Sequence, residues 1–131
     1  MKKKILNNSD KNLLLKDLCS RLPYGVIIET TWKEKYADEN CDGTIGKLRG
    51  SQLEFFEDGE YSDIKPYLRP MSSMSEEEKN EYRHLINQYS AANPESASFW
   101  IDWLNANHFD YHGLIPKNLA IAVTELNNPY K

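Results

Sequence analysis

The spacing of apolar residues first predicts a helix near the beginning of the chain. From Asp10 to Leu22, apolar side chains recur every three or four positions, which places them on one face of a helix. Ser9 or Asp10 can cap this helix, and Pro23 ends it because proline disfavours helical geometry in the residue before it. The predicted apolar face comprises Leu14, Leu15, Leu18, Cys19 and Leu22.

The pattern then changes to one that is typical of strands. Residues 24–32, YGVIIETTW, are rich in β-branched and aromatic side chains. Residues 43–50, 51–59 and about 61–68 are three further candidate strands, and Asp58–Gly59 is a turn signal before the last of them. Because sequential strands with short connections usually pair, we expect a small antiparallel sheet of about four strands, either open or closed into a barrel.

A second helix is predicted after this sheet. Ser75 followed by Glu78 is a capping-box pattern, and Ser73 with Glu76 is an alternative beginning. The acidic run at this point suits the positive end of a helix dipole. The expected buried stripe comprises Tyr82, Leu85, Ile86 and Tyr89.

A third helix is predicted over residues 95–108, where Asn93 can cap and Pro94 can take the first helical position. Its expected apolar stripe comprises Phe99 or Trp100, Trp103, Leu104 and Asn107. Tryptophans in such positions act as anchors of a core or of an interface. Residues 114–123 form a short helix or an extended packing segment, in which Pro116 argues against a central strand.

These elements predict a single α+β domain over residues 1–131, with an N-terminal helix, a small antiparallel sheet and two C-terminal helices. Residues 1–9 and 127–131 are expected to be loose termini. Two cysteines without CxxC spacing indicate free thiols and neither a zinc knuckle nor a redox motif. Cys19 lies on the first helical stripe and is expected in the core, whereas Cys41 lies in a polar stretch and is expected to be exposed.

Charge and hydropathy narrow the classes of partner that the protein can bind. The formal net charge is -4, and residues 36–81 hold twelve acidic and five basic groups, so general nucleic-acid binding is disfavoured. The basic beginning, Lys2 to Lys4, is followed by polar residues and lacks the apolar region of a signal peptide. No stretch approaches the roughly 20 apolar residues of a membrane span. We therefore expect a cytoplasmic protein with no membrane association.

The most suggestive chemistry lies in residues 108–115, HFDYHGLI. In an extended strand His108, Asp110 and His112 would share one face, and histidine with aspartate can bind zinc. The spacing is not a zinc signature, and no fourth ligand is close in sequence. In the structural interpretation, His108 interacts with the end of a helix and Asp110 caps the following turn.

Other catalytic motifs are missing from the sequence. It contains no GxSxG elbow, no GxxxxGK[ST] loop and no GxGxxG fingerprint, and a buried Cys19 would be a poor nucleophile. GTIGKLRG holds three glycines without the strand–loop–helix context of a phosphate loop. We therefore predict a protein that is not an enzyme and uses no cofactor.

Three stretches carry a resemblance: LCSRLPYGV (18–26), IKPYLRPMSSMSEEE (64–78) and DWLNANHFDYHGLIPKNLAIA (102–122). Together they resemble a family of small uncharacterised proteins from phages, prophages and mobile elements of gut anaerobic bacteria. The resemblance implies an intracellular viral or mobile-element protein and assigns no activity. Family members commonly have arginine at the position of His112, and arginine does not bind zinc. This favours a structural corner that packs Phe109, Tyr111, Leu114 and Ile115, with KPYLRP as a second corner built on Pro66 and Pro70.

Three functions remain open from the sequence. The leading hypothesis is a non-enzymatic accessory protein that binds another protein, with Trp100, Trp103 and Tyr111 as candidate interaction residues. The second is a nucleic-acid-associated module that stacks bases on aromatic side chains of the sheet, such as Tyr24, Trp32, Phe55 and Phe56. The third is a small metalloenzyme that uses His108, Asp110 and His112, with His84 as a further ligand.

Overall fold

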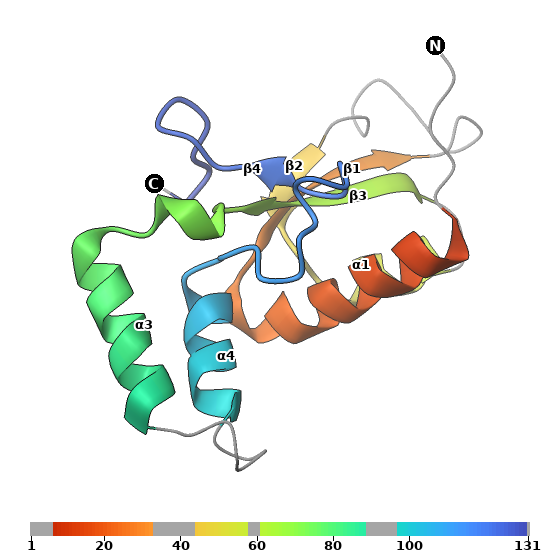
Figure 1. Cartoon of the computed structure of the whole chain (residues 1–131). Helices are drawn as coiled ribbons and strands as arrows, with labels where there is room; N and C mark the ends of the chain where they lie inside the picture. Colours follow the sequence, from red (N-terminus) through yellow and green to blue (C-terminus); the bar gives the residue numbers. More distant parts are fainter. Residues whose placement is uncertain (1–6, 33–43, 58–60, 89–96, 131) are drawn as a thin grey trace.

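The computed structural model describes residues 7–32, 44–57, 61–88 and 97–130. It has the expected α+β fold, with a helix first, a four-stranded sheet and two helices in the C-terminal half (Figure 1). The elements are α1 Asn8–Arg21, β1 Ile27–Trp32, β2 Thr44–Lys47, α2 Gly50–Glu57, β3 Tyr61–Leu68, α3 Glu76–Gln88, α4 Ala97–Ala106 and β4 Ile121–Ala122, with short 3-10 turns at Leu22–Tyr24 and Met71–Ser73. None of the described helices is long and apolar enough to cross a membrane.

The sheet is open and mixed, and it does not close into a barrel. Its strand order is β2-β1-β3-β4, with β1 antiparallel to both β2 and β3. The short strand β4 pairs in parallel with β3, through Tyr67 with Ile121 and Leu68 with Ala122. Residues 114–123, which we expected to form a short helix or an extended packing segment, therefore supply the fourth strand. This strand, β4, follows Pro116 in the sequence.

The strand predicted over residues 51–59 is wrong, because Gly50–Glu57 forms helix α2. The side chain of Gln52 accepts a hydrogen bond from the Arg49 amide at 2.8 Å, which closes one half of a capping box. Leu53 and Phe56 are three positions apart, and both pack in or against the core. Two adjacent phenylalanines favour a strand by propensity alone. The segment is nevertheless helical, because Leu53 is partly buried and Phe56 is buried on one face at helical spacing.

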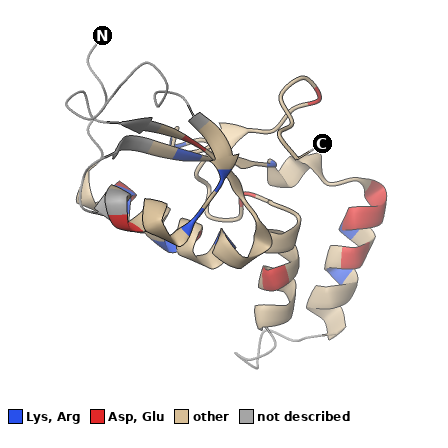
Figure 2. Cartoon of the chain, turned by 180° about the vertical axis from the view of Figure 1, so that it is seen from behind, with Lys and Arg blue, Asp and Glu red and all other residues tan. Residues whose placement is uncertain are grey.

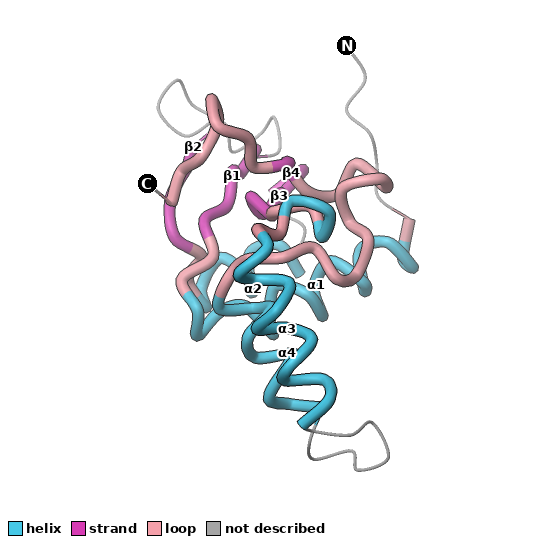
Figure 3. The backbone as a smooth tube through the Cα atoms, turned by 60° about the vertical axis from the view of Figure 1, so that its left-hand side comes forward, coloured by secondary structure: helices cyan, strands magenta, loops and turns pink. Residues whose placement is uncertain are grey.

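Helices α1 and α2 cover one face of the sheet (Figure 1, Figure 3). The core lies between these two helices and the sheet. Leu14 and Leu18 of α1 are fully buried there, together with Ile28 and Ile64 from the strands. Cys19 is exposed, so its predicted place in the core is wrong. The buried face of α1 instead contains Leu14, Asp17, Leu18 and Arg21.

Both ends of the described chain are better anchored than expected. Helix α1 begins at Asn8, and the side chain of Asn7 caps it by accepting a 2.7 Å hydrogen bond from the Asp10 amide. The expectation of loose residues up to position 9 is therefore wrong for Asn7, Asn8 and Ser9. At the other end, the Tyr130 hydroxyl accepts from the Ile27 amide at 3.0 Å and donates to the Tyr67 carbonyl at 2.7 Å.

The Tyr130 hydroxyl extends the β1–β3 ladder by one step. The register pairs Ile28 with Pro66, so Ile27 and Tyr67 are the next pair along the two strands. In place of a direct bond, the hydroxyl bridges the amide of one residue to the carbonyl of the other. The C-terminal segment is thus part of the fold, and the predicted loose tail is not observed for residues 127–130.

Helices α3 and α4 run side by side and project away from the sheet (Figure 1, Figure 3). The predicted capping box is confirmed: the Glu78 amide donates to Ser75 Oγ at 3.1 Å, and the Ser75 amide donates to a Glu78 carboxylate oxygen at 3.0 Å. The predicted buried stripe of α3 is not observed, since no residue of α3 is fully buried. Ile86 is 40% exposed. Several predicted features lie outside the described residues: Lys2 to Lys4, Cys41, the Asp58–Gly59 turn, Tyr89 and the Asn93–Pro94 cap.

Candidate functional site

Residues 108–115 form a corner that leaves α4 and returns to the sheet. His108 has a φ of 61°, so the chain turns sharply there and does not continue as a strand. The Arg69 amide donates to the His108 carbonyl at 2.8 Å, and the Asp110 amide donates to the Arg69 carbonyl at 2.9 Å. The extended strand in which His108, Asp110 and His112 would share one face is therefore not formed.

Asp110 caps the turn that follows it, as predicted. Its Oδ1 accepts from the Leu114 amide at 2.8 Å, and its Oδ2 accepts from the Ile115 amide at 3.0 Å. Asp110 is buried, and both of its carboxylate oxygens are occupied by these bonds. Phe109 and Leu114 are also buried, so the interpretation of this stretch as a packed structural corner is confirmed.

The two histidines of the corner point to different neighbours. The His108 ring stacks on the Tyr130 ring, with 3.8 Å between centroids. Burial and the nearby charges of Arg21 and Arg69 lower the pKa of His108 to about 4. The Nδ1 of His112 is 2.7 Å from Oδ1 of Asp17. Within residues 7–32, 44–57, 61–88 and 97–130, no group of three or more His, Cys, Asp or Glu side chains is arranged to hold a metal ion.

A buried polar cluster joins this corner to α1. Asp17 and Arg21 are both 0% exposed, and Arg21 Nε donates to Asp17 Oδ2 at 2.7 Å. Arg21 Nη2 donates to the Phe109 carbonyl at 2.7 Å, and the guanidinium lies over the Tyr111 ring at 5.0 Å. The sequence reasoning missed this cluster. Its signal was the spacing of 14, 17, 18 and 21, which puts Asp17 and Arg21 on the same helical face as the two leucines.

The cluster holds a histidine–carboxylate pair, which can orient a general base in hydrolytic enzymes. Such a site also needs a nucleophile beside the other ring nitrogen. No serine or cysteine of the described chain is hydrogen-bonded to His112, and its side chain is 23% exposed. The contacts of Asp17, Arg21 and His112 hold α1 against the corner, which is a structural role.

Two of the candidate interaction residues are half-buried and pack against other parts of the protein. Trp103 stacks between Tyr82 of α3 and Phe109 of the corner, with 5.6 Å between centroids on each side. Its indole Nε1 donates to Glu81 at 3.1 Å. The Tyr111 hydroxyl donates to Asn105 Oδ1 at 2.8 Å. These contacts make Trp103 the centre of a stack that fixes α3 and α4 to the corner.

The exposed large apolar residues of α3 and α4 lie near the end of α3 and the beginning of α4. Ile86 is near the end of α3 and is 40% exposed, while Phe99 is near the beginning of α4 and is 52% exposed. Trp100, the third candidate, is half-buried, and its Nε1 is buried with no hydrogen-bond partner in the part of the chain that the structure describes. We call Ile86, Phe99 and Trp100 the helix-pair surface.

The aromatics proposed for base stacking do not form one described sheet face. Phe56 is 3% exposed and enters the core from α2, and Phe55 belongs to the same helix. Tyr24 lies in the 3-10 turn before β1, where a hydrogen bond with Asp102, burial and that carboxylate's charge raise the pKa of its phenol. The side chain of Trp32 lies outside the described residues. The sheet-stacking hypothesis therefore lacks its central pair of phenylalanines.

Comparisons with protein-family models, with curated proteins and with solved structures gave no match for this chain.

Proposed function

We propose that the protein is a non-enzymatic accessory protein that binds another protein through the helix-pair surface. The observation that carries the proposal is the exposure of Ile86 in the last turn of α3 and of Phe99 in the first turn of α4, the helix that runs beside α3. Exposed large apolar side chains are typical of binding surfaces. The resemblance described above supports a cytoplasmic phage or mobile-element setting for this activity.

The stacking of Trp103 supports the proposal because it makes the surface rigid. The ring is held between Tyr82 and Phe109, and Arg69 lies 4.1 Å over the Phe109 ring. Arg69 in turn forms a forked pair with Glu78 at the beginning of α3, with distances of 2.8 and 2.6 Å. A preorganised surface loses little conformational entropy when it binds.

The charge of α3 indicates the chemistry of the partner. Its sequence contains four glutamates against Lys79 and Arg83, and Figure 2 shows the acidic groups along this helix. Glu76 and Glu77 are exposed at its beginning. The partner proposed here therefore presents an apolar patch to Ile86 and Phe99 and basic side chains to the opposite, acidic end of α3, because complementary charge favours association and orients the partners.

The experiment is a quantitative pull-down from a lysate of a gut anaerobic bacterium, with and without nuclease. The test variant is Ile86→Ser with Phe99→Ser, and the matched control is Leu126→Ser, since Leu126 is 100% exposed on another part of the chain. We expect one protein to be enriched by the wild type and by the control, and to be lost with the double variant.

Each other result contradicts this function. Equal capture by the double variant would remove the helix-pair surface as the binding site. Enrichment that nuclease abolishes would favour the nucleic-acid hypothesis. Saturable turnover of esters, phosphates or nucleotides by the purified chain would show an enzyme. Light scattering of the purified variants checks that each forms the same folded species as the wild type.

A further inference from the structure

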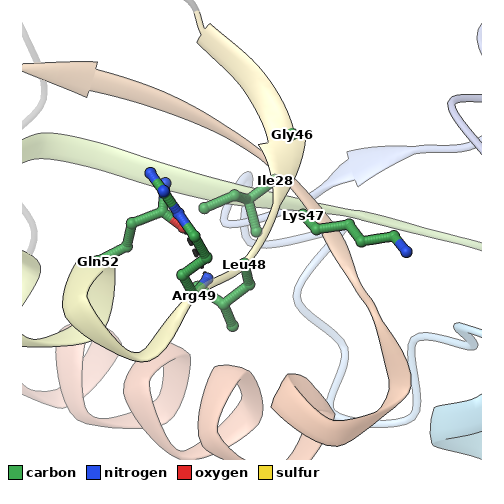
Figure 4. A pocket seen from close by; sticks show the side chains of 6 residues that line it. All are labelled: Ile28, Gly46, Lys47, Leu48, Arg49 and Gln52. Atoms are coloured by element: carbon green, nitrogen blue, oxygen red, sulfur yellow. Dashed lines mark hydrogen bonds between the residues drawn. The ribbon is translucent and has the colours of Figure 1, made fainter.

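A second surface lies on different elements, between the edge strand β2 and helix α2. A pocket of about 510 Å³ is lined there by Ile28, Gly46, Lys47, Leu48, Arg49 and Gln52 (Figure 4). The four consecutive residues from Gly46 to Arg49 line it as the chain leaves β2, so the pocket runs along the strand. Its apolar lining comes from Ile28 and Leu48, both of which belong to the core.

The outer edge of β2 offers backbone groups to another strand. β2 is the last strand of the described sheet, and its partner on the other side is β1. The Leu48 amide donates to the Val26 carbonyl at 2.9 Å, which makes this pair hydrogen-bonded. Because such pairs alternate in antiparallel ladders, Gly46 also faces β1, and the backbone groups of Ile45 and Lys47 face outward.

Gly46 leaves the pocket open. It pairs with Ile28, and residues opposite each other in a sheet share a face. Within the part of the chain that the structure describes, a Cβ at Gly46 would meet nothing within 4 Å, so no described side chain fills this space. A side chain from an added strand can enter this space, as alternate side chains do when a peptide extends a sheet edge.

The charge beside the pocket is positive although the protein is acidic. Arg49 and Gln52 lie together on one side, and Lys47 extends to the other side of the strand (Figure 4). No acidic side chain is among the residues that line the pocket. A strand added to β2 alternates its side chains between these two sides, so acidic residues on it would meet Arg49 on one side and Lys47 on the other.

We propose that the groove between β2 and α2 binds an extended acidic peptide of a partner protein by strand addition. Backbone bonds form with Ile45 and Lys47, one apolar side chain enters the space beside Gly46, and carboxylates face Arg49 and Lys47. This site is independent of the helix-pair surface, and either one can exist without the other.

The experiment selects ligands for the full-length protein from a library of random ten-residue peptides displayed on yeast. The Gly46→Val variant fills the space; a β-branched residue suits a strand, and nothing stands within 4 Å of the added Cβ. Gly50→Ala is the matched control, because Gly50 has equally open surroundings and does not line the pocket. Circular dichroism and thermal unfolding establish that the variants fold.

We expect the wild type and Gly50→Ala to enrich peptides in which one apolar residue is flanked by acidic residues at both odd and even positions, so that carboxylates reach both Arg49 and Lys47. We expect Gly46→Val to bind these peptides about tenfold more weakly or worse. Arg49→Glu should also lose them, whereas Arg83→Glu on α3 should not. Methylating the amides on one edge of a selected peptide should abolish binding, and methylating those on the other edge should leave it intact.

Three results would overturn the proposal. One is a set of peptides that Gly46→Val binds as well as the wild type does. Another is the absence of any peptide enriched over Gly46→Val. The third is a dimer of the free protein that Gly46→Val dissociates, which would make a second copy of this chain the occupant of the edge.

Discussion

Arg21 in α1 donates a 2.7 Å hydrogen bond from Nη2 to the carbonyl oxygen of Phe109, which lies 88 positions further along the chain. The same guanidinium is paired with Asp17, which also contacts His112. One buried arginine therefore connects the first helix to the corner that places Phe109 under Trp103.

Replacing Asp17 with Asn should destabilise the fold strongly. Breaking a buried ion pair from one side leaves an uncompensated charge, which typically costs about 3–5 kcal/mol. Urea unfolding followed by tryptophan fluorescence measures the change. Glu77→Gln, a change at an exposed acid, should shift the free energy of unfolding by less than about 0.5 kcal/mol.

The double variant Asp17→Leu with Arg21→Met separates charge from packing. It removes both charges while keeping apolar bulk, so it should be more stable than Asp17→Asn alone. A double variant that is no more stable than the single one would show that the bond from Arg21 to Phe109, and not the ion pair, carries the effect.

Tyr130→Phe should destabilise the protein by about 1–3 kcal/mol, because it leaves the Ile27 amide and the Tyr67 carbonyl without their shared partner. Stacking of the ring on His108 is retained in this variant. Amide hydrogen exchange gives the local readout: the Ile27 amide should exchange faster, while amides in the middle of α1 keep the protection expected from the global stability. Unchanged exchange at Ile27 would contradict the bridging role.

His108 should make stability depend on pH below neutrality. Its folded pKa of about 4 lies below the ordinary value of 6.5, so the folded state binds fewer protons than the unfolded state in this range. Stability is then lost as the pH falls from about 6.5 to about 4. At about 1.4 kcal/mol for each factor of ten in proton affinity, the loss is on the order of 2–3 kcal/mol.

The measurement for His108 is the free energy of unfolding against pH in the wild type and in His108→Asn, because asparagine tolerates a positive φ. The variant can be less stable at pH 7 through lost stacking on Tyr130. Its decrease between pH 6.5 and 4 should nevertheless be shallower than that of the wild type. Parallel curves would show that another group causes the decrease.

Glu78 should contribute at lower pH. The forked bonds from Arg69 hold its pKa at about 2, below the ordinary 4.5, so its stabilisation is present above about 4.5 and is lost as the pH falls towards 2. Glu78→Gln should cost about 1.5–3 kcal/mol at pH 7. The difference between variant and wild type should shrink below pH 4, which acid titration by circular dichroism can follow; a constant difference would exclude the charge as its source.

The sequence predicted well those features that depend on a few neighbouring residues. The α-helix ends at Arg21, just before Pro23, although Leu22 keeps helical geometry; the Ser75–Glu78 capping box begins α3, and Asp110 caps the turn at Leu114. In the two caps the donor and acceptor lie within about five positions, so their geometry follows from local backbone preferences. The strands β1, β2 and β3 were predicted on the same basis.

Only the tertiary structure decided the features that rest on distant partners. The segment around Phe56 is a helix because its helical face packs against the core. Cys19 is exposed because the buried face of α1 includes Asp17 and Arg21 and does not include Cys19. The short strand β4 exists because β3 has a free edge for it. Local propensity differs by at most about 1 kcal/mol for each ordinary residue. Burial of one large side chain contributes about 1.5–3 kcal/mol, so packing against residues far along the chain overrides the local preference.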